Sequence, residues 1–181
     1  MSDSADMPLQ PDPVPNRDIA YLERPLAELP DSFQTVYAYW HLLRGRRFAP
    51  TWQEFDMMQI PPALLPSTLV KDVERDPLAF RYRFYGTHFA RLWDRDLTGK
   101  TTDDIASPLL AQVIRQTLTH FIAQKQPAFY LLHIGPRLND HRLQVQLRLP
   151  ISNDGETVTN IVSLVSHQID MDAYSKLFTD G

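Results

Sequence analysis

One long amphipathic segment divides this sequence and limits the folds that it can adopt. Between residues 109 and 124, apolar side chains recur at spacings of three and four, which predicts a helix with one buried face; the stripe contains Leu110, Val113, Ile114, Thr117, Leu118 and Phe121. Pro127 then prevents the helix from continuing. Because such a helix must cover another element, the segments on either side of it decide the fold class.

Five segments with strand character flank this helix, two before it and three after it. They span residues 68–74, 80–85, 129–134, 142–149 and 158–167. Short polar loops that contain glycine join the last three, which predicts antiparallel hairpins. In the fourth segment Leu143, Val145, Leu147 and Leu149 alternate with Arg142, Gln144, Gln146 and Arg148. This alternation predicts a sheet with one buried face and one face in water.

Shorter helices complete the predicted order of elements. Asp31 and Ser32 can cap an N-terminal helix that ends at Gly45, with Phe33, Val36, Tyr37, Trp40 and Leu43 on one side. Two short helices are expected at residues 87–93 and from Thr101 onward. We therefore predict an α+β fold: a five-stranded antiparallel sheet with helices packed on one face, plus an N-terminal helix.

Proline and charge set the beginning of the chain apart. Residues 1–31 hold six of the 15 prolines and have a local net charge of −5, whereas the remaining residues carry +1. We predict a disordered or extended tail over residues 1–30, since prolines interrupt helices and sheet ladders. Residues 31–66 would form the N-terminal helix and a connection, 67–170 the main domain, and 171–181 a short C-terminal tail.

Bulk composition excludes several classes of protein. The chain has no cysteine, a net charge of −4 and no apolar run of about 20 residues. Disulfides and thiolate metal sites are therefore ruled out, and we expect a cytoplasmic protein that has no nucleic-acid or membrane partner.

No pattern in the sequence predicts a catalytic centre, a metal site or a cofactor. The adjacent Asp103 and Asp104 are better suited to capping a helix than to acid–base chemistry, because neighbours on a helix do not face each other. His120 lies beside the apolar stripe rather than on it, which argues against haem ligation. Glycine-rich phosphate loops and nucleophile elbows are absent. We therefore expect no enzyme.

Three short motifs in order resemble a known family. They are the stretches 39–46 (YWHLLRGR), 80–87 (FRYRFYGT) and 96–100 (DLTGK). From Tyr39 to about His167 the chain is similar to PAS domains, and most closely to a bacterial branch of stand-alone members. The resemblance implies a sensory or protein-interaction module whose ligand and partner vary within the family.

The resemblance also implies where a ligand would lie. We expect a small apolar or mixed-polarity ligand in a pocket lined by Tyr82, Phe84, Phe89, Trp93, Leu118 and Phe121, unless these six side chains simply fill the core. Arg83 would face away from Tyr82 and pair with a carboxylate. A partner protein, or a second copy bound through the opening helix as a homodimer, would carry the signal. The alternatives are a small cone-shaped α+β enzyme that resembles ketosteroid isomerase, and a ligand-free scaffold.

Overall fold

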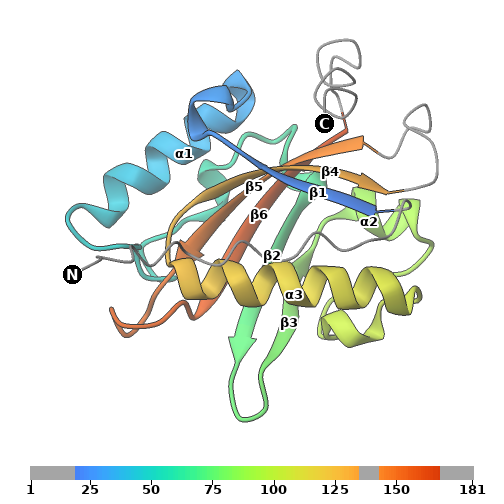
Figure 1. Cartoon of the computed structure of the whole chain (residues 1–181). Helices are drawn as coiled ribbons and strands as arrows, with labels where there is room; N and C mark the ends of the chain where they lie inside the picture. Colours follow the sequence, from blue (N-terminus) through green and yellow to red (C-terminus); the bar gives the residue numbers. More distant parts are fainter. Residues whose placement is uncertain (1–18, 135–142, 168–181) are drawn as a thin grey trace, which may run out of the picture.

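A computed structural model of the chain describes residues 19–134 and 143–167 and shows one antiparallel sheet between helices (Figure 1). The strands are β1 (Ile19–Arg24), β2 (Thr68–Glu74), β3 (Ala79–Tyr85), β4 (Ala128–Ile134), β5 (Leu143–Ile151) and β6 (Asn160–Ser166). The helices are α1 (Asp31–Arg44), α2 (Thr87–Leu92) and α3 (Pro108–Gln124), with short 3-10 turns η1 (Leu26–Glu28), η2 (Met57–Gln59), η3 (Leu65–Ser67) and η4 (Thr102–Asp104). None of the helices in these residues is long and apolar enough to cross a membrane.

The sheet has six strands in the order β1-β4-β5-β6-β2-β3, and all neighbours are antiparallel. The α+β class and the five predicted strands are confirmed, but the strand count was one too low. The sixth strand, β1, pairs with β4 along the sheet edge, with Ile19 opposite Ile134 and Arg24 opposite Phe129. The predicted tail over residues 1–30 did not include this strand; residues 1–18 lie outside the described part of the chain.

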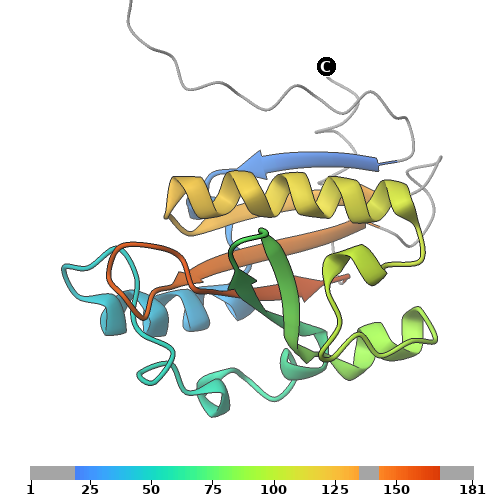
Figure 2. The same ribbon diagram turned by 90° about the horizontal axis from the view of Figure 1, so that it is seen from below.

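Both faces of the sheet are covered, as Figure 2 shows from below. Helix α1 packs on one face, where Phe33, Val36 and Trp40 are buried against apolar side chains of β4, β5 and β6. The Nε1 of Trp40 also donates a hydrogen bond of 2.8 Å to the carbonyl of Pro150. The apolar side of the opening helix is therefore buried against its own chain.

Helix α3 covers the opposite face. Leu118 and Phe121 pack with Phe80, Tyr130 and Ile161 in a second apolar cluster. Ser107 caps the helix by accepting a hydrogen bond from the amide of Leu110. The prediction of one face in water was wrong, because α3 lies over the polar face that carries Gln144, Gln146 and Arg148, and all three side chains are buried.

The chain between β3 and α3 also runs along this second face. Gly86 begins α2 at a point where a Cβ atom would overlap the carbonyl of Pro66, so a residue without a side chain is required there. Asp104 accepts a hydrogen bond from the amide of Thr101 and closes a capping box, while Asp103 pairs with Arg115. Neither carboxylate is therefore placed for acid–base chemistry.

Candidate functional site: a cationic cavity under the long helix

A cavity of about 190 Å³ lies between α3 and the sheet, bounded at one end by α2 and the chain that follows it. Its apolar walls include Leu69, Phe89, Leu110, Ile114 and Leu132. An engineered cavity of about 150 Å³ binds benzene, so this cavity can hold a ligand of roughly one ring with a short substituent.

The floor of the cavity is polar. Gln144, Gln146 and Arg148 project from β5, and Lys71 projects from β2. The aromatic side chains of Tyr82 and Tyr85 complete this part of the wall from β3. Three cationic side chains (Lys71, Arg95 and Arg148) and no acidic one line the cavity, as far as the chain is described.

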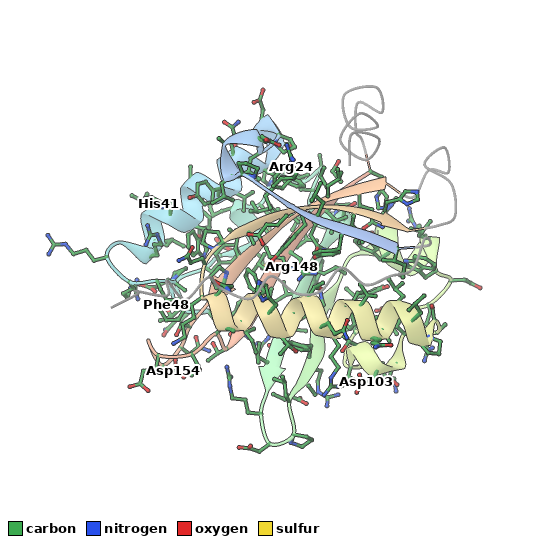
Figure 3. All side chains as sticks on the ribbon, viewed as in Figure 1. Arg24, His41, Phe48, Asp103, Arg148 and Asp154 are labelled. Atoms are coloured by element: carbon green, nitrogen blue, oxygen red, sulfur yellow. The ribbon has the colours of Figure 1, made fainter. Side chains whose placement is uncertain are left out.

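Hydrogen bonds and aromatic rings hold the side chain of Arg148 in place. Its side chain lies between the sheet and α3 (Figure 3) and is only 2% exposed. Its Nε donates to Oε1 of Gln146 at 2.9 Å, and its Nη2 donates to Oγ1 of Thr117 at 3.3 Å. The guanidinium carbon lies 5.2 Å and 4.9 Å from the ring centroids of Tyr21 and Tyr130. This geometry fixes the position of the charge.

The same guanidinium retains an unused donor. Its Nη1 is buried and has no hydrogen-bond partner among residues 19–134 and 143–167. Its neighbour across the strands is Ser163 of β6, whose buried Oγ also lacks a partner within the described chain. Since almost all buried polar groups in native proteins are hydrogen-bonded, the free Nη1 of a cation that lines the cavity indicates a place for a polar group of a ligand.

Lys71 is buried on the other side of β6. It is 2% exposed, and its Nζ lies 4.8 Å from the ring centroid of Tyr82. Burial, together with the positive charge of Arg148, lowers the pKa of Lys71 to about 7. No carboxylate forms an ion pair with Lys71 or Arg148 in the described part of the chain. Lysine and arginine are rarely buried without such a partner.

The carboxylates near these strands are engaged elsewhere. Asp72 accepts from Nε of Arg83 at 2.6 Å and from Nδ2 of Asn160 at 2.6 Å, on the face away from the cavity. Arg83 also lies over the ring of Trp52. The predicted pairing of Arg83 with a carboxylate is thus confirmed, and Asp72 is not oriented toward Lys71.

An irregularity in β3 explains which predicted residues reach the cavity. Val70 pairs with Phe84 and Lys71 pairs with Tyr82, so Arg83 is an extra residue without a partner in β2. An extra residue reverses the faces of all side chains beyond it. Tyr85 therefore joins Tyr82 on the cavity side, while Phe84 turns to the opposite face and is partly exposed.

The six side chains expected to line a pocket thus separate into two groups. Tyr82, Phe89 and Trp93 line the cavity. The other three do not: Leu118 and Phe121 fill the core under α3, and Phe84 faces away. Trp93 is 46% exposed and stands at the mouth of the cavity, close to the exposed Ala106 and Ser107.

Sequence reasoning missed the polar residues of the site. Gln144, Gln146 and Arg148 were assigned to water because they alternate with leucine and valine. Lys71 was treated as an ordinary strand residue. One available signal was its position as a single cation directly after Thr68, Leu69 and Val70, a run that is buried in the structure.

Comparison with protein families supplies the remaining observation. Residues 29–165 match the family model described as PAS domain. The chain belongs to the PAS domain family. Members of this family are in general sensory and regulatory modules rather than enzymes. The match begins just before α1 and ends in β6, so this PAS domain carries β1 as a strand that precedes the matched region. The comparison with curated proteins gives no match.

His133 and His141 could face each other across the β4–β5 hairpin, but no third histidine or carboxylate of suitable spacing for a metal joins them in the sequence. No group of three or more His, Asp or Glu side chains suited to a metal ion occurs among the described residues. His141 lies outside the described part of the chain.

Proposed function

We propose that this PAS domain is a sensory module that binds a small molecule in the cavity under α3 and passes the signal on through a protein contact. The observation that carries the proposal is the cavity itself, with apolar walls, a polar floor and a mouth at Trp93. Small-molecule sites combine apolar walls with a few convergent polar groups in this way. In a scaffold that binds no ligand, two buried cations would serve no function.

The mouth of the cavity gives the ligand a route to the protein surface. Trp93 follows α2, and Ser107 caps α3, so a ligand that contacts both would change how these two helices meet. A ligand shifts the balance of two conformations only by its difference in affinity for them. Contacts with the exposed side chains at the mouth of the cavity can supply that difference.

The proposal also includes a partner chain that receives the signal. With Phe33, Val36 and Trp40 buried on the sheet, association through the opening helix would have to use its outer side, where Leu42 is exposed. We propose a homodimer as the first form of contact to test. Light scattering with and without ligand measures it directly.

The enzyme alternative gains no support from the cavity lining. A site of the ketosteroid-isomerase kind needs a buried carboxylic acid in the cavity. The described lining residues include no acid. The titratable side chains among them are two tyrosines, Tyr82 and Tyr85, and three bases, Lys71, Arg95 and Arg148.

Two matched variants test the site. Ile114 of α3 lines the cavity, whereas Ile122, on the same helix and half-buried like Ile114, packs against the core away from the cavity. Ile114→Phe should fill the cavity, and Ile122→Phe should leave it open.

The readouts are native mass spectrometry of freshly purified protein and thermal denaturation with phenylacetamide, a neutral ring-sized probe. Wild type and Ile122→Phe should bind it and Ile114→Phe should not. A ligand at 100 times its Kd stabilises by about 2.7 kcal/mol, which raises Tm by roughly 5–10 °C in a chain of this size. If the wild type binds neither this probe nor any co-purified molecule, the proposal is wrong.

A further inference from the structure

Two buried cations in the cavity have no counter-charge, and this imbalance indicates the chemical class of the ligand. Lys71 and Arg148 stand on the two strands that flank β6, opposite Ile161 and Ser163 respectively. Their backbones are separated by two strand spacings across the sheet, about 10 Å, and by two residues along the strands, about 7 Å. Both side chains line the same cavity. The guanidinium of Arg148 lies toward the aromatic rings of β1 and β4, and the ammonium of Lys71 lies toward Tyr82 of β3, so a bound group would lie between the two charges.

The free donors of these two side chains are suited to an oxyanion. Nη1 of Arg148 has no acceptor within residues 19–134 and 143–167, although its Nε and Nη2 are hydrogen-bonded. Within the described chain, the interaction found for Nζ of Lys71 is with the face of the Tyr82 ring, a weak substitute for an acceptor oxygen. A carboxylate accepts about four hydrogen bonds through its two oxygens and matches the planar guanidinium.

The walls of the cavity determine the chemistry of the rest of the ligand. Leu69, Leu110, Ile114 and Leu132 would contact a hydrocarbon body, and the polar groups are confined to the floor. A multiply charged ligand such as a phosphate ester would have to bury additional charge against these walls. A single negative charge offsets part of the positive charge of Lys71 and Arg148 and costs less desolvation than two negative charges would.

We propose that the ligand is a small carboxylic acid, with its carboxylate held between Lys71 and Arg148 and an apolar body of about one ring against α3. This inference rests on the proposed function, because it names the ligand class of the same cavity. Arg95, at the mouth, adds a third cation on the path by which an anion would enter.

The test compares two probes of nearly the same shape. Phenylacetate and phenylacetamide differ in charge but hardly in size, and calorimetric titration of the full chain gives a Kd for each. We expect phenylacetate to bind at least tenfold more tightly than the amide. Acetate alone should bind at least a hundredfold more weakly than phenylacetate, because it lacks the body that fills the walls.

Two variants connect the preference to the cations. Lys71→Met and Arg148→Met keep the length of the side chain and remove its charge, and each should reduce the tenfold preference to less than threefold. Lys100→Met removes an exposed lysine outside the cavity and should change nothing. If Arg148→Met does not fold, Lys71→Met alone decides, since no hydrogen bond or ion pair of Lys71 is found in the described chain.

The outcomes separate the two proposals. Equal binding of acid and amide by the wild type would overturn the carboxylate inference and leave the cavity as a site for neutral ligands. A preference for the acid that survives in Lys71→Met and Arg148→Met would also overturn it. Failure of both probes to bind would count against the proposed function as well.

Discussion

The Nζ of Lys71 lies 4.8 Å from the ring centroid of Tyr82, the residue that it faces across β2 and β3. The aromatic face is the strongest interaction that the described residues offer to this buried cation. Such a contact contributes about 2 kcal/mol when it is desolvated, which is less than the free energy of removing an ammonium from water. Lys71 is therefore a destabilising residue in the ligand-free domain, and several predictions depend on it.

Lys71→Met should stabilise the ligand-free domain. At pH 6.5, where both folded and unfolded forms carry the charge, we expect the free energy of unfolding to rise by about 2–4 kcal/mol, because each unit of pKa depression corresponds to about 1.36 kcal/mol. Urea denaturation measures the change. At pH 10.5 the two proteins should differ by less than about 1 kcal/mol. A variant that is less stable than the wild type at pH 6.5 would contradict this account of Lys71.

The stability of the wild type should rise with pH from about 7 to about 10. Burial lowers the pKa of Lys71 to about 7 in the folded state, against an ordinary value of 10.5, so the unfolded chain binds more protons in this window. The charged and titratable groups that face Lys71 are Arg148 from β5, Tyr82 and Tyr85 from β3, and Arg95 from the mouth. From α3, only apolar side chains and Ser107 line the cavity.

Other groups limit this window on both sides. Burial raises the pKa of Tyr85 to about 12, so its contribution to stability is lost as the pH rises above about 10. Burial beside His88 lowers the pKa of His167, which adds a separate rise in stability as the pH increases toward about 6.5. Urea denaturation at pH 7, 8, 9 and 10 should show the rise in the wild type and a flat profile in Lys71→Met. A wild-type profile that is equally flat would be inconsistent with the prediction.

Binding of a carboxylate at alkaline pH should be coupled to the uptake of a proton by Lys71. An anion next to Lys71 favours its charged form, so affinity for phenylacetate should fall as the pH rises from about 7 to about 9. Calorimetry in two buffers of different ionisation enthalpy measures the proton uptake. Affinity for phenylacetamide should not change over the same range, and neither should affinity for phenylacetate in Lys71→Met. If the affinity of the wild type for phenylacetate does not change with pH, Lys71 does not interact with the bound carboxylate.

Trp93→Ala should lower stability by only about 1–2 kcal/mol. Trp93 stands half-exposed at the mouth of the cavity and has less packing to lose than a core tryptophan. Trp40→Ala is the matched control, because Trp40 is fully packed under the sheet and should lose about 3–5 kcal/mol or more. Chemical denaturation gives both values, and probe binding should weaken in Trp93→Ala. A loss near that of Trp40→Ala would place Trp93 in the core.

Deletion of residues 1–44 should unfold the domain rather than only separate a dimer. The deletion removes the α1 side chains Phe33, Val36 and Trp40, which cover Leu147 and Leu149 of β5. Circular dichroism and light scattering of the truncated chain measure folding and mass together. A folded monomer after deletion of a dimer-forming segment would instead show that α1 serves association alone. Leu42→Glu, on the exposed side of α1, tests dimerisation without disturbing the core.

Most strands could be predicted from the sequence because alternation and polar turns determine them locally. The positions of β2, β3, β4, β5 and β6 were each predicted to within a few residues, and so was α1. Its predicted capping by Asp31 and Ser32 was wrong, because Pro30 occupies the N-cap position and no side chain makes a capping hydrogen bond there. Strand β1 was not predicted, because residues 19–24 lie directly after a proline-rich acidic stretch and gain their structure only by pairing with β4.

The site was predicted less well for two physical reasons. Alternation in β5 separates polar from apolar side chains but does not say which side a helix will cover, and here α1 and α3 cover both. The extra residue at Arg83 is also invisible to a pattern of period two, so Phe84 was assigned to the wrong side. Long-range packing settles both questions, and no local sequence signal carries it.

The aromatic cover of Arg148 comes partly from a strand at the very edge of the sheet. Tyr21 of β1 lies over the guanidinium and donates a hydrogen bond to Oε1 of Gln146 at 3.0 Å. Yet in the described sheet β1 is an edge strand whose backbone pairs with β4 alone. Fraying of that strand would admit water to the guanidinium and weaken its pull on an anion. Occupancy of the cavity and pairing of the outermost strand are therefore linked equilibria that share one arginine, and a shift in either must appear in the other.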